Sequence, residues 1–164
     1  MKTMIARASL LVLLAMGSLL PAWAQDDKEA ATRKLVESRR YEFIPQSAMP
    51  LSGRVRQLTP DFSLVVTKDT LNSYLPYFGR AYQAPINTTE GGIQFVSTSF
   101  EYTASPRKKS GWDISIKPKD AGDVQQMQLS ISETGYASLQ VISTNRQAIS
   151  FNGYITGVKG KKKK

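Results

Sequence analysis

The segments Trp112-Asp-Ile-Ser-Ile-Lys117 and Gln126-Met-Gln-Leu-Ser-Ile-Ser132 decide the fold, because apolar and polar residues alternate in both. Alternation with a period of two places the apolar side chains on one face of a β-strand. A short linker that contains the turn-like residues 119–122 joins the two segments. A parallel return needs a dozen or more residues, so the sequence predicts two neighbouring antiparallel strands.

The alternating pattern extends outward from these two strands. It begins in the long apolar segment 93–103 and continues through Leu139 and Val141 to Phe151 and Ile155. Short turn-like linkers separate the segments, so the C-terminal half predicts an antiparallel meander of about five strands. A sheet with one apolar face must curl into a small barrel or pack as a sandwich against a second layer. The predicted fold class is therefore mainly β, with an N-terminal α-helix.

The N-terminus has the features of a secretory signal peptide, with Lys2 and Arg7 before an apolar run over residues 10–20. Ala22-Trp23-Ala24 then supplies the small-residue pattern of a cleavage site. The apolar run is shorter than the roughly 20 residues that span a bilayer. We therefore predict an exported protein that is cleaved after Ala24 and has no transmembrane segment after signal removal.

The remaining chain divides into three parts. Residues 25–40 are rich in helix formers and predict a surface helix, and residues 41–156 predict a single β-rich domain. Residues 157–164 predict a lysine-rich disordered tail. Within the domain, residues 70–83 contain four aromatic residues without a clean period, which predicts a short helical turn, capped by Asp69, followed by an aromatic loop.

Composition excludes several kinds of chemistry. The chain contains no cysteine and no histidine, which excludes disulfides and nucleophile systems that need either residue. We accordingly expect no cofactor and no metal site. Loss of Lys2 and Arg7 lowers the net charge from +9 to +7, and four of those charges belong to residues 161–164. The remaining +3 does not predict a nucleic-acid partner.

The aromatic loop is the predicted ligand-binding site. Tyrosine and phenylalanine offer large faces for stacking on a sugar or a protein partner. The alternative is that these side chains plug an open end of the sheet as part of the core. The residues concerned are Tyr74, Tyr77, Phe78 and Tyr82.

Asp120 and Asp123 lie in one short turn and are candidates for a calcium site or a glycosidase acid pair. Structural stabilisation of the turn by these side chains is the favoured interpretation. A carboxylate-only glycan hydrolase, with Glu101 and Asp113 as further candidates, is an alternative function. Trp112 is predicted to lie in the core, in phase with the apolar residues of its strand.

The antiparallel meander also predicts where positive charge collects. The strand over residues 93–104 leads to one basic turn, and the last strand returns the C-terminus to the same end, opposite Asp120 and Asp123. Such a cluster could contact an anionic surface, and a merely solvated tail is the alternative. The predicted contact residues are Arg107, Lys108, Lys109, Lys161, Lys162, Lys163 and Lys164.

Four phrases occur in order: Asp69-Thr-Leu-Asn-Ser-Tyr-Leu-Pro-Tyr-Phe-Gly-Arg-Ala-Tyr82, Gly111-Trp-Asp-Ile-Ser-Ile116, Gly135-Tyr-Ala-Ser-Leu139 and Asn145-Arg-Gln-Ala-Ile-Ser-Phe-Asn-Gly153. Together they resemble a family of small exported proteins from Bacteroidota catalogued as domain of unknown function 4251, over about Arg39 to Gly153. The resemblance implies a Gram-negative, periplasmic protein with a β-rich fold. It transfers no activity and no site residue. Some relatives are lipoproteins, but this chain lacks the cysteine that a lipid anchor requires.

These observations predict a non-catalytic periplasmic binding or interaction module of the bacterial envelope. Its expected partner is an anionic envelope polymer or an envelope protein. A small β-barrel that carries an apolar ligand is the other alternative, since barrels of this size can hold one small molecule. Its cavity would be lined by Phe95, Leu129, Val141 and Phe151.

Overall fold

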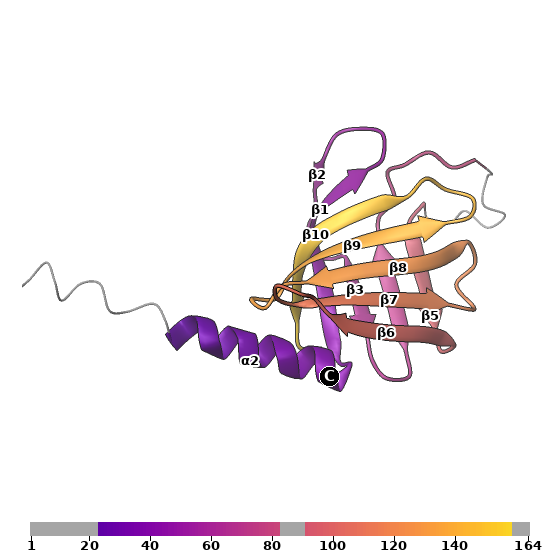
Figure 1. The fold of residues 1–164 in the computed structure, drawn as a ribbon. Helices are drawn as coiled ribbons and strands as arrows, with labels where there is room; N and C mark the ends of the chain where they lie inside the picture. Colours follow the sequence, from indigo (N-terminus) through magenta and orange to yellow (C-terminus); the bar gives the residue numbers. More distant parts are fainter. Residues whose placement is uncertain (1–22, 83–90, 159–164) are drawn as a thin grey trace, which may run out of the picture.

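The computed structural model describes residues 23–82 and 91–158, in which helix α2 (Trp23–Ser38) precedes a β-sheet (Figure 1). Every pair of neighbouring strands runs antiparallel. The strands are β1 (Tyr41–Pro50), β2 (Arg56–Gln57), β3 (Ser63–Val66), β4 (Leu71–Leu75), β5 (Ile93–Ser97), β6 (Phe100–Pro106), β7 (Trp112–Pro118), β8 (Val124–Ile131), β9 (Tyr136–Ser143) and β10 (Ile149–Thr156).

The strand order is β5-β4-β3-β1-β10-β9-β8-β7-β6, with β2 added beside β1. The sheet curls into a nearly closed barrel whose two edges, β5 and β6, are consecutive in the sequence (Figure 1). Strands β6 to β10 form the five-strand meander that the alternating pattern predicted. The prediction of a mainly β, antiparallel fold with an N-terminal helix is confirmed.

Apolar side chains from all sides of the barrel fill its interior. Tyr41, Phe43 and Phe151 are completely buried, and each aliphatic side chain buried with them contributes about 2 kcal/mol to folding. Trp112 faces inward, as predicted, but is only half-buried because it begins β7 at one end of the barrel. The core therefore consists of the inward-facing residues of the alternating pattern, and Trp112 at a strand end is less buried than they are.

Strand β1 lies between β3 and β10 and has a bulge between Pro45 and Ser47. Gly153 lies opposite Pro45, and a Cβ at this position would collide with the backbone of Ile44. Bulges increase twist and bend a strand locally. The close approach of Gly153 to the Ile44 backbone thus lies at the bulge, where β1 bends and the sheet curls.

Residues 70–82, the described part of the segment predicted as a helical turn and loop, differ from the prediction of a helical turn. Leu71, Ser73 and Leu75 point inward from β4 and are buried, whereas Asn72 and Tyr74 point outward. Pairing with β3 and β5 on both sides outweighed the irregular aromatic pattern. The role predicted for the aspartate before this segment is also wrong, because a hairpin turn closed by hydrogen bonds between Thr67 and Thr70 replaces the capped helix.

Residues 93–104 were predicted to form one strand, but they form β5 and β6, separated by a corner at Thr98 and Ser99. The backbone N–H of Lys119 donates to the Ser99 carbonyl at 2.8 Å, and the Asp120 carboxylate accepts hydrogen bonds from Ser97 and from the backbone of Thr98. The β7–β8 turn therefore holds the corner. These contacts place consecutive strands at opposite edges of the sheet.

Helix α2 begins two residues before the predicted start and ends at Ser38. Arg39 adopts a left-handed conformation (φ 49°), and the backbone N–H groups of Arg39 and Arg40 bond back to the carbonyls of Val36 and Leu35. This pair of hydrogen bonds is a Schellman motif, which ends a helix and turns the chain. As predicted, the helix lies on the surface, and its N-terminal part projects away from the barrel (Figure 1).

Candidate functional site

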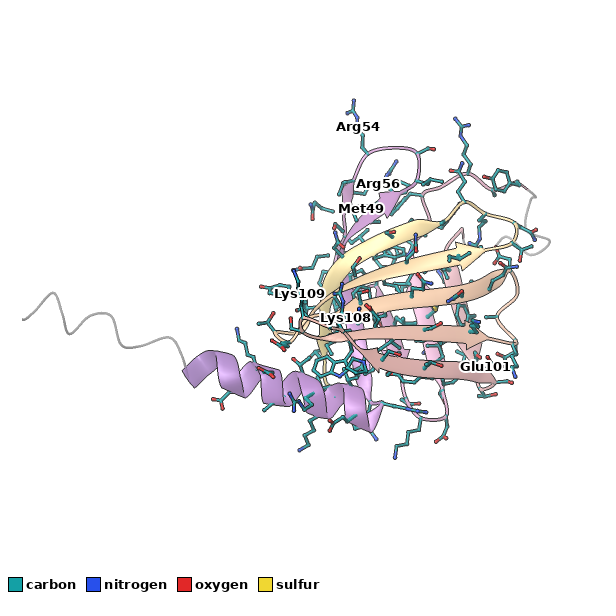
Figure 2. The ribbon with its side chains drawn as sticks, viewed as in Figure 1. Met49, Arg54, Arg56, Glu101, Lys108 and Lys109 are labelled. Carbon is teal, nitrogen blue, oxygen red and sulfur yellow. The ribbon has the colours of Figure 1, made fainter. Side chains whose placement is uncertain are left out.

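The antiparallel register collects several turns at the end of the barrel beside α2, which we call the basic end. The β6–β7 turn, the β8–β9 turn and the last residues of β10 lie there (Figure 1). The backbone N–H of Ile155 in β10 donates to the carbonyl of Gly135 in the β8–β9 turn at 2.8 Å. Figure 2 shows Lys108 and Lys109 at this end. Its β6–β7 turn exposes Arg107, Lys108 and Lys109.

This position matches the prediction for the basic turn, whereas contact with an anionic surface stays a prediction. Asp120 and Asp123 lie in the β7–β8 turn at the opposite end, also as predicted. The tail residues with which the basic turn was predicted to act lie outside the described residues. They are Lys161, Lys162, Lys163 and Lys164.

A groove of about 1000 Å³ separates α2 from the basic end of the barrel. Helix α2 lines one wall with Lys28, Ala31 and Leu35, and Tyr136 and Tyr154 line the other. Lys34 also borders the groove, and both lysines are exposed. The groove therefore combines an apolar and aromatic floor with a positively charged rim.

Close packing of α2 on the β8–β9 turn closes the bottom of this groove. Gly135 has a left-handed φ of +87°, and a Cβ there would lie 3.3 Å from the Thr32 hydroxyl. Thr32 is buried and donates to the backbone carbonyl of Lys28 at 2.8 Å. A glycine is required by both the conformation and the tight contact.

The C-terminal end of α2 is fastened to the barrel by an aromatic cluster. The Arg39 guanidinium lies 4.7 Å from the centre of the Tyr102 ring, and the Tyr102 and Tyr41 hydroxyls are 3.3 Å apart. Burial, supported by the neighbouring phenol, raises the pKa of Tyr41 well above its ordinary value. Burial also raises the pKa of Tyr102. Both phenols are therefore neutral at physiological pH and act as structural contacts.

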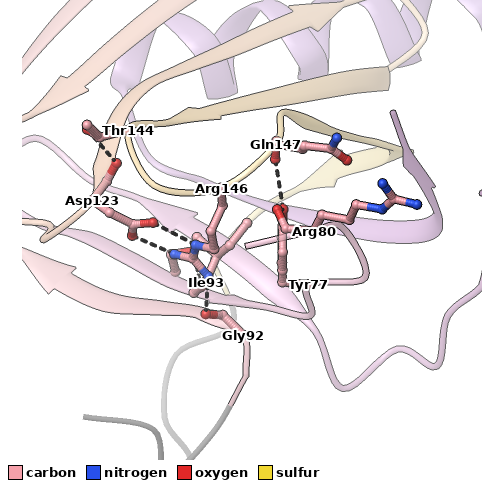
Figure 3. A network of polar contacts seen from close by, with 9 residues as sticks. Tyr77, Arg80, Gly92, Ile93, Asp123, Thr144, Arg146 and Gln147 are labelled. Atoms are coloured by element: carbon pink, nitrogen blue, oxygen red, sulfur yellow. Dashed lines mark hydrogen bonds and ion pairs between the residues drawn. The ribbon is translucent and has the colours of Figure 1, made fainter. Parts of the chain in front are cut away.

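Arg146 joins several loops at the opposite end of the barrel, which we call the Arg146 end (Figure 3). Its guanidinium donates two hydrogen bonds of 2.6 Å to the Asp123 carboxylate and one of 2.9 Å to the Gly92 carbonyl. The two ionic side chains are only 12% and 22% exposed. A bidentate pair with this much burial fixes geometry as well as charge.

The same guanidinium lies 5.0 Å from the centre of the Tyr77 ring. The Tyr77 hydroxyl shares its one proton between the carbonyls of Arg80 and Gln147, at 2.8 and 3.1 Å, which connects the segment after β4 to the β9–β10 turn (Figure 3). Burial raises the pKa of Tyr77, while Arg146 opposes the increase. Arg146 thus links the β7–β8 turn, the β9–β10 turn and the segments that flank residues 83–90.

The four predicted ligand-binding aromatics do not form one surface. Tyr77 and Phe78 pack against the core, and the Arg56 guanidinium lies 4.7 Å from the centre of the Phe78 ring. Tyr74 points outward from β4 and Tyr82 is 68% exposed. The alternative role as a plug describes Tyr77 and Phe78. The Tyr74 ring stacks on Phe62 with centroids 5.7 Å apart, so ligand stacking stays a prediction for Tyr82 and for the other face of Tyr74.

The four acidic candidates have separate partners. Asp120 accepts a hydrogen bond from Ser97, which lowers the pKa of its carboxyl, and Asp123 pairs with an arginine. Glu101 pairs with a lysine at 3.1 Å and Asp113 accepts from Ser130 at 2.7 Å. Asp113 lies opposite Ser105, so it is about 13 Å along the sheet from Glu101, beyond the spacing of a glycosidase pair.

The residues predicted to line a carrier cavity belong to the packed interior. Leu129, Val141 and Phe151 are 1%, 1% and 0% exposed, and Phe95 packs against the same cluster. The grooves beside α2 lie outside the barrel. Among the helices of the described residues, none has the length and apolar character that crossing a membrane requires.

Sequence reasoning missed Arg146 and the groove. No site role was predicted for Asn145-Arg146, yet the meander places its turn and the turn that contains Asp123 at the same end. Opposite charges on two neighbouring turns were therefore a usable signal. The sequence contains no such signal for the groove, because the groove depends on how α2 packs against the β8–β9 turn.

Together these features define a nearly closed antiparallel barrel with an N-terminal helix at its basic end. Residues 24–155 match the family described as "Domain of unknown function (DUF4251)", and the chain belongs to that family. The resemblance noted in the sequence is confirmed. No curated protein matches the chain.

The fold is similar to that of a solved protein. That protein is a DUF4251 family protein from Bacteroides eggerthii DSM 20697, whose crystal structure matches with a TM-score of 0.59 over 79% of this chain and 87% of that chain. The two sequences are 11% identical. At this identity the similarity concerns the fold alone.

Proposed function

We propose that this protein is a non-catalytic binding module of the bacterial envelope, exported to the periplasm, that binds an anionic envelope polymer at its basic end. The absence of histidine and cysteine from the sequence supports a non-catalytic role, because most acid–base and nucleophilic sites use one of them. The signal-like N-terminus supports export.

One observation carries the proposal: five exposed cations lie at the basic end, and two of them border an open groove of about 1000 Å³. Arg107, Lys108 and Lys109 lie on the barrel side, and Lys28 and Lys34 lie on α2. A cation close to an anionic surface contributes roughly 1 kcal/mol, and the effect decays over a Debye length of about 8 Å at physiological salt. Weak, salt-sensitive attachment follows.

Co-sedimentation with vesicles that contain lipopolysaccharide, at low and high salt, tests the proposal. The triple variant Arg107→Gln, Lys108→Gln, Lys109→Gln should bind at least roughly tenfold more weakly at low salt, since it loses three cations. The matched control replaces Arg80, Lys117 and Lys119, three exposed cations elsewhere, by glutamine.

The control should retain binding, although its net charge is equally reduced. Equal losses in both triple variants would mean that only net charge matters and would contradict a basic-end site. Deleting residues 161–164 tests the tail separately, and a further loss of low-salt binding is expected.

Export has its own test. The mature protein should begin at Gln25 and fractionate with the soluble periplasm. Mass spectrometry that finds residues 1–24 on a stable cytoplasmic product would overturn the envelope assignment.

A further inference from the structure

Three adjacent strands of the barrel carry no charge. None of the residues of β8, β9 or β10 is acidic or basic, although 21% of the whole chain is charged. Well-dispersed protein surfaces carry roughly 25–35% charged residues. An exposed sheet face without any of them therefore needs an explanation other than solubility.

The register arranges the outward side chains of these strands in rows. Gln128 lies beside Gln140, which lies beside Ser150. The next row contains Ser130, Ser138 and Asn152. Neighbouring strands are about 4.8 Å apart, so each row is a closely spaced series of hydroxyl and amide groups. We call the two rows together the uncharged face.

Much of the hydrogen-bonding capacity of the uncharged face is free. Among the described residues, no side-chain hydrogen bond joins Gln128, Ser138, Gln140 or Ser150 to the rest of the protein. Amide and hydroxyl groups both donate and accept hydrogen bonds. Sugar hydroxyl groups have the same dual character, whereas the ionised side chains of a polyanionic peptide only accept hydrogen bonds.

Two tyrosines and an arginine border the uncharged face on the side of the basic end. Tyr136 and Tyr154 are directly opposite each other on β9 and β10, and Tyr136 is 67% exposed. A shallow groove of about 350 Å³ joins Tyr136 to Arg107, Ser138 and Asn152. Aromatic rings give stacking platforms, and arginine recognises carboxylate and phosphate groups.

We infer that the uncharged face binds an acidic polysaccharide, with sugar rings over Tyr136 and the hydroxyl and amide rows, and acidic groups toward Arg107 and the groove beside α2. This inference rests on the proposed function, because it names the chemistry of the polymer that the basic end attracts. The cations provide attraction to any polyanion, and the uncharged face provides selectivity for a sugar chain.

Affinity electrophoresis with three soluble polymers tests the inference: polygalacturonate, polyglutamate and dextran. The wild-type protein should bind polygalacturonate roughly tenfold more tightly than polyglutamate, the scale of one well-placed aromatic contact. The double variant Tyr136→Ala, Gln140→Ala should abolish this preference, because it lowers the affinity for polygalacturonate far more than the affinity for polyglutamate. It removes hydroxyl, amide and aromatic contacts but no charge.

The matched control is the double variant Tyr74→Ala, Gln94→Ala. These residues are also a tyrosine and a glutamine on an outer face, directly paired across β4 and β5. The control should keep the preference for polygalacturonate. Urea midpoints for both double variants verify that each is folded.

The outcomes separate the two proposals. Equal affinity of the wild-type protein for polygalacturonate and polyglutamate, or equal effects of the two double variants, would overturn the polysaccharide inference and leave the basic-end site intact. Binding to dextran as tight as to polygalacturonate would overturn the acidic part of it. Failure to bind either polyanion or lipopolysaccharide vesicles would overturn the proposed function as well.

Discussion

The two ends of the barrel use arginine in opposite ways. At the Arg146 end, one largely buried guanidinium donates hydrogen bonds to Asp123 and Gly92, with an aromatic ring nearby. At the basic end, Arg107 is exposed and only 3.4 Å from one half-exposed aspartate. Burial, more than residue type, therefore separates a cation that stabilises the fold from one that is accessible to a partner.

The largest expected effect concerns the Arg146 end. Asp123→Ala would leave the Arg146 guanidinium poorly solvated and without its partner, which typically costs about 3 kcal/mol of the free energy of unfolding. Arg107→Ala at the basic end should change it by less than about 0.5 kcal/mol. Urea denaturation of the two variants measures both effects.

Equal stabilities for the Asp123 and Arg107 variants would remove the distinction between the two ends. A change in the denaturant slope of the Asp123 variant, without a shift in midpoint, would instead indicate a less compact native state. The double variant Asp123→Ala, Arg146→Met should recover part of the loss, because it removes the unpaired charge.

A smaller effect is expected from the tyrosines, which lie at both ends. Folding raises the pKa of Tyr41, Tyr102 and Tyr77 above their value in the unfolded chain, near 10. Above about pH 10 the unfolded chain loses protons that the folded protein retains, so stability decreases as pH rises.

Tyr41→Phe removes the most strongly buried of these phenols and should make the alkaline decrease less steep. Near neutral pH it should cost about 1 kcal/mol, because the hydrogen bond with Tyr102 is lost. Unfolding by urea from pH 8 to pH 11 tests this, and identical pH profiles for the variant and the wild-type protein would contradict it.

The smallest effect belongs to Asp120, which holds the corner between β5 and β6. Its folded pKa is lowered by the Ser97 hydroxyl, so its contribution to stability is present above the ordinary aspartate pKa and is lost as pH falls through the lowered value. Asp120→Asn should flatten the acid side of the stability profile. A wild-type acid profile in this variant would show that the corner does not depend on the carboxylate.

The sequence predicted the meander well, because each of its strands has a clean alternation and a short turn. It failed at β4, where Tyr74 and Tyr77 suggested a loop although Leu71 and Leu75 have the spacing of a strand. It also failed at Thr98 and Ser99, where apolar residues continue on both sides of the corner. Long-range pairing decided both cases, and local patterns do not report it.

The candidate sites were less predictable than the strands. The turn with Arg107, Lys108 and Lys109 could be placed at one end by counting strands. The groove could not be predicted in this way. Nor could the separation of the four predicted aromatic residues into two that pack against the core and two that are exposed. Each depends on which side chains another element covers. Tyr77 and Tyr82 are five residues apart, yet one is half-buried and the other is 68% exposed.

In the proposed division of roles, the basic end binds the anionic polymer and the Arg146 end stabilises the fold. The most direct test measures the affinity for lipopolysaccharide vesicles and the urea midpoint on the same variant, Arg107→Gln, Lys108→Gln, Lys109→Gln. We expect the urea midpoint of this variant to be unchanged and most of its salt-sensitive binding to the vesicles to be lost. Unchanged binding in a variant that is normally folded would contradict it.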